Sequence, residues 1–125
     1  MSFDWKLYLL LSDELINDQK NPTLQEAYLR SAISRSYYGV FCIARNFLAK
    51  TNTLPPYNIH NYVIVKYKKS NNKKERKIGV DLDKLRGKRI SADYIDGFYV
   101  NTNEATFANQ LAIQILENLK KIGAA

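Results

Sequence analysis

The sequence contains one cysteine and one histidine in 125 residues, and this scarcity excludes several kinds of site. Cys42 has no second cysteine with which to form an internal disulfide, and one Cys with one His cannot complete a zinc site. The sequence also lacks a Gly-rich phosphate loop and a His-Glu-x-x-His motif. We therefore expect a fold without metal or cofactor that depends on its hydrophobic core.

Long apolar runs are absent as well. Asp4, Asp13 and Glu14 bound the short apolar run at residues 7–11, so the pattern of a secretory signal peptide is missing. No stretch approaches the ~20 apolar residues that span a bilayer. A lone cysteine suits a reducing compartment. Together these features predict a soluble, cytoplasmic protein that does not contact a membrane.

Acidic residues are scarce in one part of the chain. Residues 66–89 contain eleven of the nineteen Lys and Arg but three acids, a net charge of +8, which leaves −1 for the rest of the chain. A localised basic segment is typical of proteins that bind phosphates. The alternative is a solvated segment whose lysines only maintain solubility. Composition does not decide between them.

Apolar residues recur at spacings of three and four, which is the pattern of amphipathic helices, and alternation typical of strands is hard to find. Gly and Pro mark the breaks. Apolar residues make up 46% of the chain, enough for one core in a chain of this length. We predict one all-α domain over residues 1–125, an antiparallel bundle of four to five helices. The expected helices are residues 2–19, 22–50, 58–69, 78–94 and 102–122.

Local patterns refine these expectations. Ser2 is the expected N-cap of the first helix, Pro22 opens the second, and Gly123 ends the last. The second helix is apolar or semi-apolar on both sides, which indicates a central position. The lysine-rich residues 70–77 are expected to form a loop. The first helix is expected to bury a stripe on one face: Leu7, Leu10, Leu11, Glu14 and Leu15.

Arginines on apolar helix surfaces are the strongest candidates for a site. Arg35 lies within the second helix, and Arg89 interrupts the apolar stripe of the fourth. Arg86, Arg89 and Asp93 share one helix face by their spacing. A guanidinium among apolar groups needs an anion or a paired carboxylate, because its desolvation is costly. Either Asp93 and tyrosine hydroxyls satisfy the arginines internally, or these side chains bind a phosphate.

The candidates for phosphate binding are therefore Arg35, Arg86, Arg89, Asp93 and Tyr38. Candidates for catalysis are weaker. His60 follows Ile59 at the start of a helix, where a lone histidine is more often structural than catalytic. The nine tyrosines sit mostly at core spacing, although some could stack on bases of single-stranded nucleic acid.

The segment Ala32-Ile33-Ser34-Arg35-Ser36-Tyr37-Tyr38-Gly39-Val40-Phe41 resembles the central-helix pattern of the HEPN family, especially its small bacterial members. Two further segments are similar to the family pattern. They are His60 and the run from Asp81-Leu82 through Leu85-Arg86 to Arg89-Ile90-Ser91-Ala92-Asp93-Tyr94. The resemblance covers roughly residues 5–120 and implies a helical bundle that forms a symmetric dimer.

The resemblance also implies a functional context. Many HEPN proteins are ribonucleases, often toxins, that are paired with a small nucleotidyltransferase antitoxin. The nuclease members use an arginine and, four to six residues later, a histidine at the dimer cleft. Arg89 matches that arginine, but positions 93–96 are Asp93, Tyr94, Ile95 and Asp96, so the histidine is missing. Tyrosine, with an ordinary pKa near 10, is a poor proton carrier at neutral pH.

Three hypotheses follow. The first is a non-catalytic homodimer that binds a nucleotide, RNA or a nucleotidyltransferase partner, in a setting like that of toxin–antitoxin pairs. The second is a metal-independent ribonuclease toxin in which Arg89 acts with His60 or Tyr94 in place of the missing histidine. The third is a helical protein-interaction module without a nucleic-acid role. The sequence favours the first.

Overall fold

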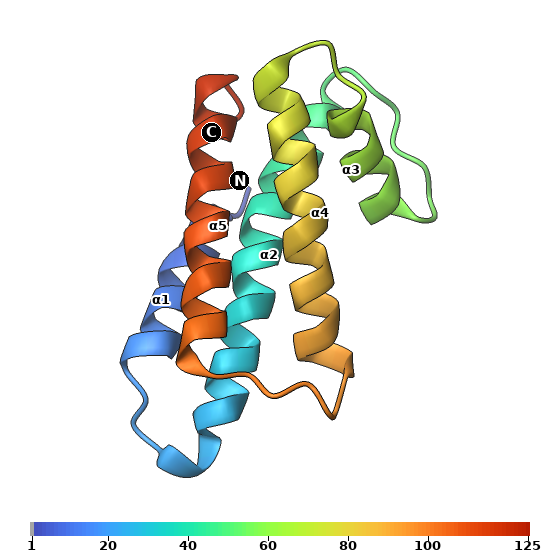
Figure 1. Cartoon of the computed structure of the whole chain (residues 1–125). Helices are drawn as coiled ribbons and strands as arrows, with labels where there is room; N and C mark the ends of the chain where they lie inside the picture. Colours follow the sequence, from blue (N-terminus) through green and yellow to red (C-terminus); the bar gives the residue numbers. More distant parts are fainter. Residues whose placement is uncertain (1) are drawn as a thin grey trace.

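The computed structural model describes residues 2–125 as an all-helical bundle, and these residues contain no strand. The elements are α1 (Leu7–Asn17), the short 3-10 helix η1 (Pro22–Leu24), α2 (Gln25–Ala49), α3 (Ile59–Lys68), α4 (Lys73–Tyr94) and α5 (Thr102–Lys121). In Figure 1, α1 and α4 run downward while α2 and α5 run upward. The predicted antiparallel five-helix bundle is therefore confirmed.

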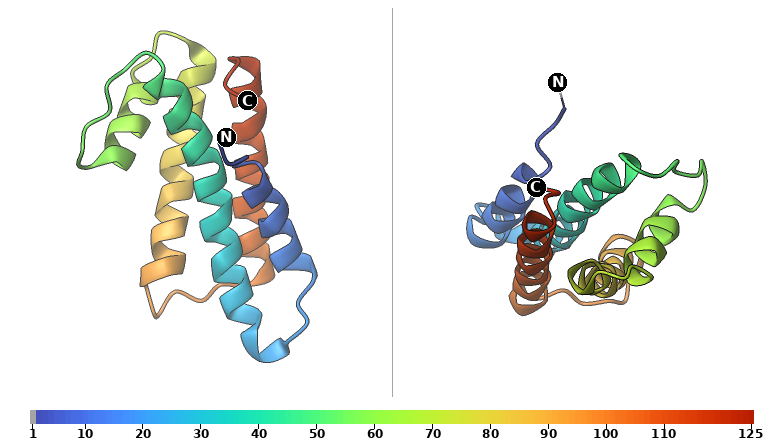
Figure 2. Two further views of the ribbon diagram at one scale, coloured as in Figure 1. Left: turned by 180° about the vertical axis from the view of Figure 1, so that it is seen from behind. Right: turned by 90° about the horizontal axis from the view of Figure 1, so that it is seen from above.

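Helix α2 is central because it packs against α1, α4 and α5, as its two apolar sides predicted. Leu29, Ile33, Tyr37, Val40 and Ala44 are buried along it. Cys42 is also buried and is a free thiol. The short helix α3 packs mainly on α4, beside one end of the bundle (Figure 2). One apolar cluster joins buried residues from all five α-helices.

Close backbone approach at two glycines brings the helices together. A Cβ on Gly39 would lie 3.2 Å from the carbonyl oxygen of Trp5, where α1 crosses α2. A Cβ on Gly79 would lie 2.5 Å from the backbone nitrogen of Lys68, where α4 meets the end of α3. Glycine is needed at position 79, because a side chain there would push the backbone of Lys68 away, whereas a Cβ on Gly39 would only make a tight contact.

The expected start and buried face of the first helix were wrong. Helix α1 begins at Leu7 and ends at Asn17, and Ser2 does not cap it. The Asp4 carboxylate instead accepts a hydrogen bond from the Lys6 backbone N–H at 3.1 Å. The buried residues are Leu9, Ser12 and Ile16, whereas Leu7, Leu10 and Leu11 are exposed. The buried Ser12 hydroxyl bonds to α2 at Ala32 O and Ser36 Oγ, which sets the rotation of the helix.

The expected loop at residues 70–77 was also too long. Asn72 caps α4, because its side chain accepts hydrogen bonds from the N–H groups of Lys74 and Glu75. This cap starts the helix at Lys73, so the basic residues 73–77 form its first turns. The other predicted boundaries agree with the structure to within a few residues. No helix within residues 2–125 is both long and apolar enough to cross a membrane.

Candidate functional site

Arg89 lies at the centre of a polar cluster between α2 and α4. Its side chain is buried, and its guanidinium lies over the rings of Tyr37 and Tyr38 from α2, at 5.4 and 5.2 Å from their centroids. The ring of Tyr94 lies 5.8 Å away on the same helix as Arg89. A cation enclosed by aromatic faces is stabilised by their quadrupoles, which offsets part of its lost hydration. The expectation that Arg89 sits among apolar helix surfaces is confirmed.

Asp93 neutralises Arg89 incompletely. The Oδ2 atom of Asp93 lies 3.6 Å from Nη1 of Arg89, which is an ion pair but longer than a hydrogen bond. The same oxygen accepts a hydrogen bond of 3.2 Å from the Ser34 hydroxyl. Asp93 is thus shared between α2 and α4 and does not fully satisfy the arginine.

Arg86 lies one turn before Arg89 on the same helix face. Its Nε atom and that of Arg89 are both shielded from solvent, and neither has a hydrogen-bond partner within residues 2–125. Of these two guanidiniums, only that of Arg89 has an ion pair with a carboxylate within residues 2–125. Buried donors without a partner are rare in folded proteins, and a bound anion is one group that can supply the acceptor.

His60, from the first turn of α3, adds a third helix to the cluster. Its Nδ1 atom and the Tyr37 hydroxyl share a hydrogen bond of 2.7 Å, and its ring stacks on Phe41 with 4.1 Å between centroids. Burial and, to a lesser extent, the positive charges of Arg86 and Arg89 together lower the pKa of His60 to about 4. Burial also raises the pKa of Tyr37. Both groups are therefore neutral at pH 7.

The cluster (Ser34, Tyr37, Tyr38, His60, Arg86, Arg89, Asp93 and Tyr94) is henceforth called the Arg89 cluster. It can hold an anion, because it carries two guanidiniums against one carboxylate. Proton transfer at neutral pH is poorly supported, because its imidazole is a weak base. The residues that the structure describes contain no group of three or more His, Cys, Asp or Glu placed to hold a metal.

Arg35 is not part of the Arg89 cluster. It is half-buried on the side of α2 that faces α1, and its guanidinium lies 4.9 Å from the centroid of the Tyr8 ring. No hydrogen bond or ion pair within residues 2–125 joins it to Arg86, Arg89 or Asp93. The expected shared pocket of Arg35 and Arg89 is thus absent from this arrangement, because the two side chains leave α2 and α4 toward different neighbours.

A comparison with family models identifies the domain. The family model of the HEPN domain matches residues 18–122. The chain belongs to the HEPN family. No curated protein and no solved structure matches it. Within this HEPN domain, the central-helix segment around Arg35-Ser36-Tyr37-Tyr38 supplies the aromatic wall of the Arg89 cluster, and the Arg89–Asp93 segment supplies its charges.

Sequence reasoning missed two residues that shape this end of the HEPN domain. Tyr37 was expected only as a core residue, but its hydroxyl binds His60. Arg30 was not singled out, yet its guanidinium donates hydrogen bonds to the carbonyl oxygens of Ala92 and Ile95 and to that of Phe98. Arg30 thereby fixes the last turn of α4, which carries Asp93 and Tyr94, and the connection that follows it. Neither role has a local sequence pattern, since each joins residues distant along the chain.

Proposed function

We propose that this HEPN domain binds RNA or a nucleotide through a phosphate at the Arg89 cluster, as a homodimer, and does not cleave the ligand. The observation that carries the proposal is the pair of shielded Nε atoms of Arg86 and Arg89, which have no hydrogen-bond partner within residues 2–125, while only Arg89 is paired with a carboxylate. A phosphate offers several acceptor oxygens and negative charge, and it is the anion that arginine pairs bind most effectively.

The absence of cleavage follows from the proton chemistry of the cluster. Cleavage of RNA without a metal needs a base to activate the 2′-OH and an acid to protonate the leaving group. The histidine expected one turn after Arg89 is replaced by Asp93 and Tyr94. His60 has a pKa of about 4 and is hydrogen-bonded to Tyr37, so it is a neutral imidazole at pH 7 and not the imidazolium that would serve as a general acid.

The proposed dimer would use the exposed apolar residues beside the cluster. Ile90, Tyr94 and Ile95 expose 37%, 69% and 48% of their surfaces at the end of α4. A second copy covering this face would place two Arg89 clusters near each other. Size-exclusion chromatography with light scattering should give twice the chain mass of 14.4 kDa. Ile90→Glu should shift the protein to the monomer.

The binding test uses two variants of α4. A short fluorescent oligouridylate is titrated with the wild type, Arg86→Gln and Lys84→Gln, and anisotropy is followed at several salt concentrations. Lys84 is exposed and is two residues from Arg86, so it faces away from the cluster while its replacement removes the same charge. Arg86→Gln should weaken binding roughly 10- to 100-fold, the equivalent of one charge-assisted hydrogen-bond pair of about 1.5–3 kcal/mol.

The salt dependence separates the proposal from its rivals. Loss of one phosphate contact should reduce the slope of log K against log salt by about 0.7 for a single strand. Lys84→Gln should retain nearly all affinity. Equal losses in both variants would show that only net charge matters, and the Arg89 cluster would not be the site. Cleaved oligouridylate on a gel, lost in His60→Gln, would favour a ribonuclease instead.

A small nucleotidyltransferase remains the protein partner that we propose to test. The exposed apolar end of α4 and the basic charge of residues 66–89 would supply the contact surface. Co-expression with a nucleotidyltransferase encoded next to this chain should give a complex that survives size-exclusion chromatography. The Ile90→Glu variant should reduce its yield.

A further inference from the structure

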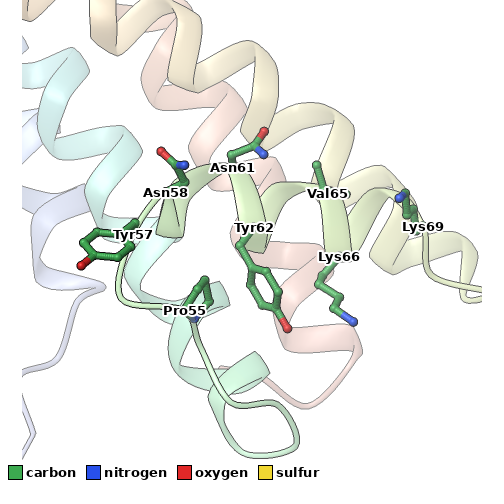
Figure 3. Close-up of a pocket in the computed structure, with 8 residues that line it drawn as sticks. All are labelled: Pro55, Tyr57, Asn58, Asn61, Tyr62, Val65, Lys66 and Lys69. Carbon is green, nitrogen blue, oxygen red and sulfur yellow. The ribbon is translucent and has the colours of Figure 1, made fainter.

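A second candidate site lies on the outer side of α3, away from the Arg89 cluster. It is a hollow of about 550 Å³ between α3 and the loop before it, here called the α3 groove. Figure 3 shows its side chains in a row, with Tyr57 at one end, Tyr62 in the middle and Lys66 and Lys69 toward the other end. Asn58 and Asn61 line the same hollow. None of its lining residues is acidic.

Helix α3 separates the α3 groove from the Arg89 cluster. His60 points inward, where it binds Tyr37 and stacks on Phe41. The next two residues, Asn61 and Tyr62, line the groove on the outside. The two sites therefore share a helix but no residue, and each can be altered without touching the other.

Tyr57 is the most exposed large aromatic residue among those that the structure describes, with 79% of its surface accessible. Asn58 follows it with φ 52° and ψ 39°, a left-handed conformation that asparagine tolerates better than most residues. This sharp turn starts α3 and places Tyr57 just before the helix. An aromatic ring held at the mouth of a hollow offers a flat face on which a planar ligand group can stack.

The cations of the α3 groove are free to bind an anion. Neither Lys66 nor Lys69 forms an ion pair within residues 2–125, although the neighbouring Lys68 binds Asp83. The amino group of Lys66 lies 5.6 Å from the centroid of the Tyr62 ring, at the side of the groove. Lys69 leads into the exposed basic first turns of α4, which extend the positive surface beyond the groove. The segment from residue 66 to 89 carries a net charge of +8.

We infer that the α3 groove binds a short segment of single-stranded RNA, with one base stacked on Tyr57 and a phosphate of the same segment held by Lys66 and Lys69. The choice of RNA rests on the proposed function. Three observations favour this occupant over an acidic peptide or a lipid headgroup. An exposed aromatic ring and two cations without ion pairs line the same hollow, the asparagine amides can bind base edges, and the volume can hold a nucleotide. A duplex hides its base faces, so only an unpaired base can stack there.

The test uses the full chain, the fluorescent oligouridylate and inorganic polyphosphate, which carries phosphates without bases. Tyr57→Ala removes the stacking face, Tyr57→Phe keeps it, and Lys66→Gln removes one cation. Tyr99→Ala is the matched control, because Tyr99 exposes 72% of its surface on the connection before α5, at the far end of the bundle from α3. All three residues changed are solvent-accessible, and circular dichroism would verify the fold of the four variants.

Tyr57→Ala should weaken oligouridylate binding roughly 5- to 150-fold, which corresponds to the loss of one stacked base. Tyr57→Phe and Tyr99→Ala should bind nearly as the wild type does. Polyphosphate binding should respond to Lys66→Gln and not to Tyr57→Ala. Equal weakening of both ligands by Tyr57→Ala would overturn the stacking role.

The outcomes also separate this inference from the proposed function. If Arg86→Gln weakens oligouridylate binding and Tyr57→Ala does not, the α3 groove is not an RNA site, and the Arg89 cluster still is. If only Tyr57→Ala weakens it, the Arg89 cluster is not the site, and the groove is. A wild type that binds polyphosphate but not oligouridylate overturns both assignments to RNA.

Discussion

Replacing Gly79 with alanine would place a methyl group where α4 meets the end of α3. The new Cβ would lie 2.5 Å from the Lys68 backbone nitrogen, closer than Cβ atoms come to other heavy atoms in proteins, and 3.0 Å from its Cα, which is a tight contact. Since Lys68 contributes backbone here, α3 itself must shift. Overpacking of this kind costs about 1–3 kcal/mol. A helical Gly→Ala change gains up to about 1 kcal/mol in propensity, so we expect a net loss of up to about 2 kcal/mol.

Gly87 provides the control on the same helix. A Cβ there would meet no atom within 4 Å, and the residue is exposed. Gly87→Ala should therefore stabilise the protein by about 0.5–1 kcal/mol, through helix propensity alone. Because both variants gain the same propensity, the difference between their unfolding free energies isolates the overpacking at α3.

Urea unfolding followed by circular dichroism would measure both variants. In thermal unfolding of a chain of this length, a change of 1 kcal/mol in the free energy of unfolding corresponds to a shift of roughly 3–6 °C in Tm. Gly79→Ala should also weaken oligouridylate binding, since α3 carries both His60 and the α3 groove. A Gly79→Ala variant as stable as Gly87→Ala would refute the close helix crossing described above.

Two further predictions concern His60 and Arg30. The pKa of His60 is about 4 in the folded protein and near 6.5 when unfolded, so the unfolded state binds the extra proton between these values. The free energy of unfolding should therefore fall as the pH drops from about 6.5 to 4. The urea midpoint of His60→Gln should fall less than that of the wild type over the same range. Parallel curves of urea midpoint against pH for the two proteins would contradict this. Arg30→Met should cost about 2–3 kcal/mol and speed hydrogen exchange in residues 95–98, because it removes charged donors from several carbonyls. Glu26→Gln breaks only the 3.0 Å exposed pair with Arg30 and should cost about 0.5 kcal/mol or less. Equal costs for these two variants would show that the carbonyl contacts contribute nothing.

The helices could be predicted from the sequence because apolar residues recur at helical spacing within each one, and polar, Gly or Pro residues separate it from the next. The two-sided apolar pattern of α2 identified the central helix, and the Asn101 and Gly123 ends of α5 lie where the pattern stops. The rotation of α1 could not be predicted in the same way. Several leucines compete for the buried face, and the hydroxyl of Ser12, which bonds to α2, decides between them.

The site was partly predictable. A guanidinium on an apolar stripe marks Arg89 in the sequence, and its helical spacing links it to Arg86 and Asp93. The contact between His60 and Tyr37 joins residues 23 apart in the chain, and no local pattern indicates such a pair. The direction of Arg35 was equally hidden, because it depends on Tyr8 of α1. The α3 groove forms from a loop and a helix face together, so composition alone gives no hint of it.

The lone sulfur of Cys42 gives the molecule an internal reporter. The thiol is 4% exposed in the middle of the central helix, and burial raises its pKa, so a thiol reagent in solution reaches it only when the helices part. Its rate of labelling therefore measures how often the bundle opens. Because the chain contains no other cysteine, that measurement needs no engineered label, and it reads out the same event in every variant.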